Sequence, residues 1–226
     1  MPQVLGMPKY YLLGGENTHK RDAQEINQRA FNDAGELPKI LVFSWARASF
    51  DESYLKSKLL FDYFRNLGAR TVKILNYSTE PREIKERVCE SNVVYLTGGV
   101  PSVLLERLKK LGVDSLLKDF EGVIVGRSAG ALALCKKCVI TYRSDLSVKV
   151  IAGLGLADIT LKTHYRLGTD EALIELSKVQ DIYAVPKGSA LVYDNSKLSF
   201  INDVYLFSNG ERQLLSEALL EEKFQI

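Results

Sequence analysis

The sequence is poor in histidine, in cysteine and in long hydrophobic runs, and each shortage narrows the chemistry available. Only two histidines, His19 and His164, occur among 226 residues, so a reaction that needs an imidazole must use one of them. The three cysteines are an odd number with no secretory signal ahead of them, which favours a reducing, cytoplasmic location. No apolar run approaches the roughly 20 residues of a membrane-spanning helix.

The net charge of the chain is also small. The net charge is only +2 and the basic residues are scattered among acidic ones, which gives no electrostatic basis for a nucleic acid or a membrane as partner. Cys135 and Cys138 form a C-x-x-C pair, but no second pair exists for a zinc site and Cys89 is distant. We expect two buried or half-buried thiols at the end of a helix, with no metal and no organic cofactor.

What is present fits one soluble α/β domain over residues 1–226, since 46% of the residues are hydrophobic and 26% are charged. Strand and helix patterns alternate in the first half, which predicts a mostly parallel sheet with helices on both faces. The predicted strands are 9–13, 38–45, 71–75, 93–96 and 123–125, and the predicted helices are 21–34, 51–67, 81–90 and 102–111.

The second half has a different character, with short strands joined by turns. These strands should add in antiparallel fashion at one side of the sheet. A last helix is predicted for residues 211–222. The predicted strands are 139–142, 148–151, 182–185, 190–193, 198–201 and 204–207.

The stretch most informative about chemistry is Gly126-Arg127-Ser128-Ala129-Gly130, between a buried strand and a helix that includes Ala131 to Leu134. A G-x-S-x-G sequence in a sharp strand-to-helix turn lifts a hydroxyl out at the end of the strand. The two glycines let the turn pass close to its own strand and helix. Ser128 is therefore a candidate nucleophile, and the alternative is a serine that only caps the helix.

A serine nucleophile needs a base, and histidine is the usual one. His19 lies in a polar stretch and is expected at the surface, whereas His164 ends an alternating run, residues 159–165, typical of a strand. The predicted pair is Ser128 with His164. The alternative for His164 is a half-buried ring bonded to a backbone carbonyl. Gly98-Gly99, after the strand 93–96, is a candidate source of oxyanion donors.

These motifs, in this order, resemble the peptidase E and cyanophycinase family of serine peptidases, whose fold is similar to that of class I glutamine amidotransferases and is flavodoxin-like. The resemblance covers nearly the whole chain. It rests on Gly98-Gly99, the G-R-S-A-G-A turn at 126–131, the G-L-G-L segment at 153–156 and His164-Tyr165.

The resemblance implies a serine peptidase in which Ser128 is the nucleophile, His164 is the general base, and the amides of Gly99 and Ala129 form the oxyanion hole. It implies short, dipeptide-like substrates and no cofactor. Arg166 is a loose candidate for binding substrate, and the aspartate specificity of the dipeptidase branch cannot be carried over. A monomer or a homodimer is expected.

The sequence departs from the family where the triad acid is expected. A P-E-G stretch downstream of the histidine supplies a glutamate in the dipeptidase branch, but here the matching stretch reads Pro186-Lys187-Gly188. A lysine beside an imidazole raises the cost of charging it. Family members also often read G-G-N where Val100 follows the two glycines. Asp145 is the first substitute for the acid, followed by Asp158, Asp170 and Asp194.

The presence of Lys187 at the position of the triad acid also supports a different class of function. The chain would then be a binding or regulatory protein that retains the G-x-S-x-G turn but no longer catalyses hydrolysis. Within enzymes, the alternative is an esterase of the α/β-hydrolase type, which shares G-x-S-x-G. The sequence lacks an obvious H-G-G-G loop, and His164 precedes too many strands for that fold.

Overall fold

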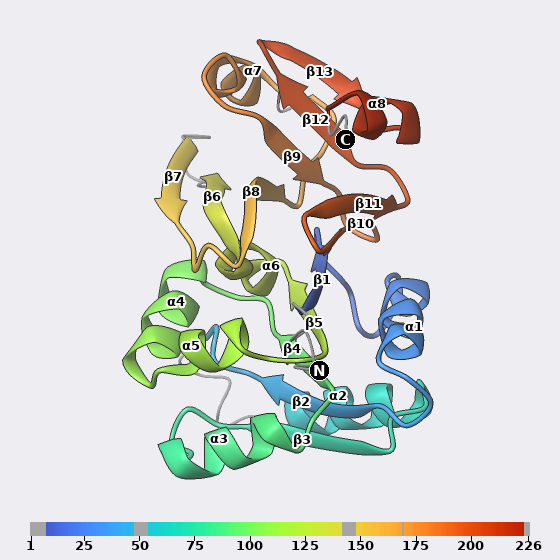
Figure 1. Cartoon of the computed structure of the whole chain (residues 1–226), viewed down its shortest axis with the longest axis vertical. Coiled ribbons are helices and arrows are strands. Elements are labelled where there is room, and N and C mark those ends of the chain that lie inside the picture. Colours follow the sequence, from blue (N-terminus) through green and yellow to red (C-terminus); the bar gives the residue numbers. More distant parts are fainter. Residues whose placement is uncertain (1–7, 48–53, 142–147, 169, 224–226) are drawn as a thin grey trace, which may run out of the picture.

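The computed structural model describes residues 8–47, 54–141, 148–168 and 170–223, which form thirteen strands and eight helices. Up to β5, each strand is followed by one helix or, before β5, by two (Figure 1). These elements are β1 (Lys9–Leu13), α1 (Gln24–Asp33), β2 (Lys39–Phe43), α2 (Tyr54–Asn66), β3 (Thr71–Leu75), α3 (Pro81–Cys89), β4 (Val93–Leu96), α4 (Pro101–Lys110), α5 (Val113–Lys118) and β5 (Val123–Arg127).

Seven strands form the first sheet, in the order β11-β10-β1-β5-β4-β2-β3. Strands β1 to β5 are parallel to one another. All four residues of β4 are buried, as expected for parallel strands covered on both faces. Two later strands, β10 (Ala190–Asp194) and β11 (Lys197–Ile201), add in antiparallel fashion beside β1. The predicted α/β class with a mostly parallel sheet is confirmed.

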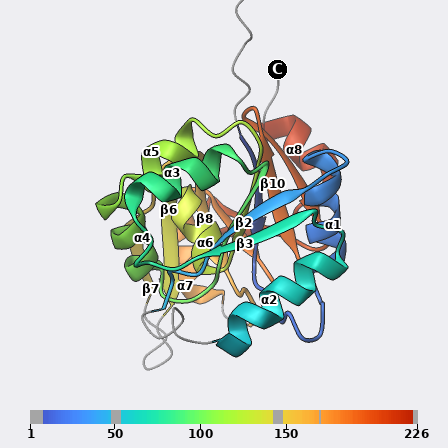
Figure 2. The ribbon, with the colours of Figure 1, turned by 90° about the horizontal axis from the view of Figure 1, so that it is seen from below.

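Helices cover both faces of this sheet because its strands alternate their side chains between two cores. Tyr11 and Leu13 face α1 and α2 in one core, whereas Tyr10 and Leu12 belong to the other core, which α3 to α5 cover. Figure 2 shows these two helical layers on opposite sides of the strands. None of the helices in the described ranges combines the length and apolar character that crossing a bilayer requires.

Six strands form a second sheet, in the order β13-β12-β9-β8-β6-β7. The expectation that the second half would only extend the first sheet is therefore wrong for these strands, and β8 is parallel to both β6 and β9. The remaining elements are α6 (Ala129–Leu134), β6 (Cys135–Thr141), β7 (Val148–Ala152), β8 (Ala157–Thr163), α7 (Glu171–Ser177), β9 (Ile182–Val185), β12 (Tyr205–Ser208), β13 (Glu211–Leu214) and α8 (Glu217–Lys223).

The chain enters the second sheet directly after α6, which is only six residues long and is followed at once by β6. Cys135 caps the end of α6 and begins β6, whereas Cys138 lies within that strand, so the predicted position at the end of the helix is wrong for Cys138 only. Both thiols are buried, as predicted. Their thiols donate to the carbonyls of Ala131 and Leu132. Burial raises the pKa of both thiols, that of Cys138 to about 12, so neither is a reactive thiolate at neutral pH.

The predicted helix at 211–222 is wrong in its first part. Glu211 pairs with Ser208 in a hairpin, and the helix α8 begins only at Glu217. Asn209 and Gly210, both with positive φ, form the two-residue turn. Such turns join antiparallel strands whose twist they match.

Candidate active site

The turn between β5 and α6 holds Ser128 in a backbone conformation that residues other than glycine rarely adopt. Its φ is 53° and its ψ is −107°, which lies outside the regions that L-residues favour. Such a conformation costs on the order of 1–3 kcal/mol and is characteristic of functional sites. The strand, the turn and the helix follow one another as the G-x-S-x-G motif predicts.

Two glycines allow this turn to form because backbone atoms occupy the space of a side chain. A β-carbon on Gly126 would lie 2.6 Å from the amide nitrogen of Ala131, and one on Gly130 would lie 2.2 Å from the carbonyl oxygen of Leu96. Helix α6 therefore rests directly on β5 and β4. Any larger residue at either position would push the helix away from the sheet.

His164 reaches Ser128 from the second sheet. It follows the last residue of β8, its φ is 55°, and its backbone N–H donates to the carbonyl of Gly14 at 2.9 Å. The Nε2 atom of His164 lies 2.7 Å from the Oγ atom of Ser128. The structure thus brings together the two residues that the sequence paired. His19 is exposed, as expected, and the His164 side chain also keeps contact with solvent.

Gly14 and Gly15, at the end of β1, pack against His164 and the segment that follows β9, and we call this pair the glycine floor. The sequence analysis did not identify this contact. A β-carbon on Gly15 would lie 2.5 Å from Cε1 and 2.7 Å from Nδ1 of His164. One on Gly14 would lie 2.0 Å from the carbonyl oxygen of Pro186. The available signal was the pair of glycines directly after a buried strand, since β1 is the neighbour of β5.

The loop between β4 and α4 approaches Ser128 from another side. A β-carbon on Gly98 would lie 3.3 Å from the β-carbon of Ser128. The next residue, Gly99, packs against Ala46, and the amide of Val100 donates to the Ala46 carbonyl at 2.7 Å. In the described part of the chain, no backbone acceptor takes the amides of Gly99 and Ala129. Among the described residues, these two candidate oxyanion donors therefore break no backbone hydrogen bond when they bind an oxyanion.

The surroundings of His164 are strongly cationic. Loss of hydration, followed by the charges of Lys187, Lys162, Arg166 and Arg127, lowers the pKa of His164 to about 4. We call these four side chains the cation cluster. Burial also lowers the pKa of Lys162 to about 8, and its Nζ donates to the carbonyl of Thr163. An imidazole in this setting is neutral at pH 7 and costly to protonate.

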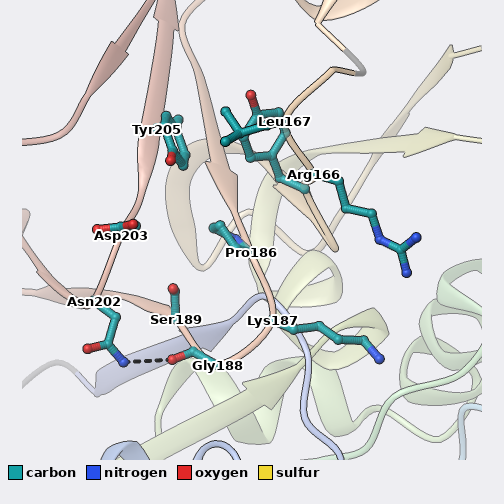
Figure 3. Close-up of a pocket in the computed structure, with 10 residues that line it drawn as sticks. Arg166, Leu167, Pro186, Lys187, Gly188, Ser189, Asn202, Asp203 and Tyr205 are labelled. Carbon is teal, nitrogen blue, oxygen red and sulfur yellow. Dashed lines mark hydrogen bonds between the residues drawn. The ribbon is translucent and has the colours of Figure 1, made fainter.

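A pocket of about 620 Å³ adjoins the cation cluster (Figure 3). Two members of the cluster, Arg166 and Lys187, contribute to its wall, and Figure 3 shows their side chains extending to the same side. Asn202 closes another part of the wall by donating to the carbonyl of Gly188 at 2.8 Å. The lining residues are Tyr165, Arg166, Leu167, Pro186, Lys187, Gly188, Ser189, Asn202, Asp203 and Tyr205.

Comparison with known protein families shows the family to which this chain belongs. The model of peptidase family S51 matches residues 11–201, a range that includes Ser128, His164 and Lys187. The chain belongs to this family. It is therefore a serine-type peptidase, and the resemblance predicted from its motifs is confirmed. Membership favours this activity over the esterase alternative.

Solved structures agree on the fold. A peptidase from an acI-B1 actinobacterium superposes with a TM-score of 0.69 at 18% sequence identity, covering 95% of this chain and 96% of its own. A putative peptidase E protein from Listeria monocytogenes EGD-e gives a TM-score of 0.64 at 20% identity, covering 86% of this chain and 98% of its own. No curated protein matches the chain significantly.

Membership in family S51 does not identify the carboxylate that orients His164 in this chain. Asp145 lies outside the described residues. Asp158 pairs with Lys136 near the start of β8, whereas His164 follows the end of that strand. In the described ranges, no hydrogen bond or ion pair joins the ring of His164 to a carboxylate.

The other carboxylates considered have partners elsewhere. Asp170 accepts from the hydroxyl of Tyr165 at 2.7 Å and pairs with Arg212. Asp194 lies 3.5 Å from Lys9. Glu16 follows the glycine floor, but its carboxylate accepts from the hydroxyl of Tyr95 at 2.9 Å and from Asn27 at 3.2 Å.

Proposed function

We propose that this chain hydrolyses short peptides through an acyl-enzyme formed on Ser128, with His164 as general base. The observation that carries the proposal is the 2.7 Å distance between Ser128 Oγ and His164 Nε2. This is within the reach that proton transfer between a nucleophile and its base requires. The strained turn supports the same role because it presents the hydroxyl away from the strand.

The reaction follows from these positions. His164 takes the proton of Ser128 as the oxygen attacks the peptide carbonyl, and it then gives this proton to the leaving amine as the C–N bond breaks. Water repeats the attack on the ester and releases the acid. His164 is neutral at pH 7, so it is in the form that can accept the proton.

The amides of Gly99 and Ala129 are proposed to donate to the oxyanion that forms on the carbonyl oxygen. They flank Ser128, one in the neighbouring loop and one in the next residue, and neither has a backbone acceptor in the described ranges. One such donor typically contributes a factor of about 10² to 10³ in kcat.

Dipeptides are the proposed substrate class. The pocket whose wall includes Arg166 and Lys187 has a volume of about 620 Å³, which is of the size that small ligands occupy, and neither Ser128 nor His164 is among its lining residues. Arg166, in its wall, is the proposed contact for a substrate carboxylate. An aspartate at the N-terminus of the substrate is the first side chain to test, and the proposal does not depend on it.

The test is hydrolysis of a panel of dipeptides and dipeptide amides, including Asp-X, by the wild type and by Ser128→Ala. The matched control is Ser199→Ala, since Ser199 is an exposed serine on β11. We expect turnover and fluorophosphonate labelling in the wild type and the control, and neither in Ser128→Ala. Turnover that survives in Ser128→Ala would overturn the proposal.

A second candidate function is favoured by one observation, the position of Lys187 next to His164. A cation in place of the triad acid weakens catalysis, and a chain that still holds the peptide would act as a binding or regulatory protein. This candidate expects saturable binding of a dipeptide with neither turnover nor labelling of Ser128.

A further inference from the structure

Consecutive backbone carbonyls at the end of β1 hold the nucleophile and the base. The carbonyl of Leu13 accepts from the amide of Ser128 at 3.0 Å. The next carbonyl, that of Gly14, accepts from the amide of His164 at 2.9 Å. Because the two acceptors are neighbours on one chain segment, the relative position of the serine and the histidine depends on where this segment lies.

Gly15, the next residue, contacts both the ring of His164 and the turn that follows β9. Its carbonyl accepts from the amide of Gly188, in that turn, at 3.1 Å. A β-carbon on Gly15 would lie 2.5 Å from Cε1 of His164, so the imidazole rests directly on the glycine backbone. Any shift of this segment therefore moves the surface against which the ring packs.

Glu16 anchors the segment on its other side. Strand β1 ends at Leu13 and helix α1 begins at Gln24, so the intervening residues are held in part by side chains. The carboxylate of Glu16 accepts from the hydroxyl of Tyr95 at 2.9 Å and from Nδ2 of Asn27 at 3.2 Å. Tyr95 lies on β4 and Asn27 on α1, and both are buried. Glu16 thereby ties the residues that follow β1 to the sheet and to α1.

The two donors are arranged for this carboxylate. Asn27 is 1% exposed, and its Nδ2 also donates to the hydroxyl of Tyr63 at 2.9 Å, whereas its Oδ1 has no hydrogen-bond partner among the described residues. The opposite orientation of the amide would turn Oδ1 toward Glu16, and two acceptors would then face each other. Burial, and then the charge of Glu16, raise the pKa of Tyr95, so its hydroxyl keeps the proton that it donates. Hydrogen bonds to an ionised group are stronger than those between neutral groups.

We infer that Glu16 is a positioning residue of the active site, which acts on His164 through the glycine floor. The inference rests on the proposed function, since it assigns how the general base of that reaction is held in place. Without the carboxylate the floor is free to shift, and the distance of 2.7 Å between His164 Nε2 and Ser128 Oγ is no longer maintained. A displacement of about 1 Å can cost about 10²-fold in rate. Glu16 exchanges no proton in this role.

The experiment measures two rate constants in Glu16→Ala, namely kcat for a dipeptide and the rate constant with which a fluorophosphonate labels Ser128. Both should fall about tenfold or more while KM changes little, because the base is displaced and the substrate contacts are not. Loss of folded protein would instead lower only the fraction of chains that is labelled. Glu16→Gln keeps the length of the side chain and one acceptor oxygen, and it should recover both rate constants to within a few-fold of the wild type. The control is Glu25→Ala, an exposed glutamate on α1, which should keep both wild-type values.

A double-mutant cycle tests whether Glu16 acts through the glycine floor. Gly15→Ala already prevents the ring from keeping its position, so adding Glu16→Ala to it should cost much less than the tenfold expected in the wild type. Equal losses in the two backgrounds would overturn the inference. Tyr95→Phe is a second variant, which removes one donor and keeps the ring that packs against Phe64. It should lower the rate constant of labelling several-fold, and an unchanged value would also overturn the inference.

Failure of the inference differs from failure of the proposed function. Turnover and labelling in the wild type, with both rate constants unchanged in Glu16→Ala, overturn the inference alone. Absence of turnover and of labelling in the wild type overturns the proposed function, and the inference with it.

Discussion

Ser128 and His164 meet at 2.7 Å with both backbones at positive φ, 53° and 55°. Neither residue is a glycine, so each conformation is maintained by its surroundings. Ser128 is held between β5 and α6, and His164 is held by its hydrogen bond to Gly14. The pair is thus fixed before any substrate arrives, which is the preorganisation that nucleophilic catalysis requires.

Substituting Gly15 should disable His164 without disturbing the core. In Gly15→Ala the new methyl group would occupy space 2.5 Å from Cε1 of His164, so the ring cannot keep its present position beside Ser128. A displacement of about 1 Å can cost about 10²-fold in rate, and we expect kcat to fall by this factor. Steady-state kinetics with a dipeptide measure it.

Gly35→Ala is the matched control for this variant. Gly35 also has a positive φ, 98°, but no atom lies within 4 Å of its added β-carbon. The control should lose some stability because of its backbone conformation and should keep its kcat. Equal kcat values for the two variants would show that the contact with His164 does not matter.

Gly99→Ala should weaken stabilisation of the oxyanion. The added β-carbon would lie 2.4 Å from the carbonyl oxygen of Ala46, which forces the loop and the Gly99 amide to shift. We expect kcat to fall about 10²- to 10³-fold, with a smaller change in KM. Gly112→Ala, at positive φ in open space, is the control and should keep its kcat. An unchanged kcat in Gly99→Ala would remove this amide from the oxyanion hole.

The pH dependence of kcat/KM should place its acidic limb near pH 4, the pKa to which His164 is lowered. Cations disfavour the protonated ring, so removal of one raises the pKa. In Lys187→Met the limb should therefore move to higher pH, toward 6.5. The measurement uses a dipeptide amide in buffers without carboxylates. A wild-type limb already near 6.5 would contradict the influence of the cation cluster.

Asp145→Asn tests the carboxylate that the sequence predicts to orient His164. If Asp145 has this role, the variant should lose up to about 10⁴-fold in kcat. Steady-state kinetics with a dipeptide measure it, and a kcat within a few-fold of the wild type would remove Asp145 from the triad.

The parallel half of the fold could be predicted because its signals are local. The strands 71–75 and 93–96 lie at the predicted residues, and the helix predicted for 102–111 is displaced by one residue. Runs of buried β-branched residues, with a proline at the start of a helix, need no distant partner to be recognised. The pairing of Ser128 with His164 was also accessible, since histidine is scarce.

The remaining features depend on residues far apart in the chain. The floor under His164 joins Gly15 to positions 164 and 187, and no local pattern encodes such a contact. The second sheet depends on where α6 ends, and no glycine or proline marks the step from Leu134 to Cys135, where β6 begins. A short apolar run does not distinguish a helix from a buried strand.

The placement of Ser128 and His164 on different sheets has a consequence for inactivation. Mild denaturant or heat that separates the sheets, while each keeps its own hydrogen bonds, would part the two side chains before the chain as a whole unfolds. Loss of turnover should then precede loss of far-ultraviolet circular dichroism. A loss of turnover would therefore report separation of the two sheets before the chain as a whole unfolds.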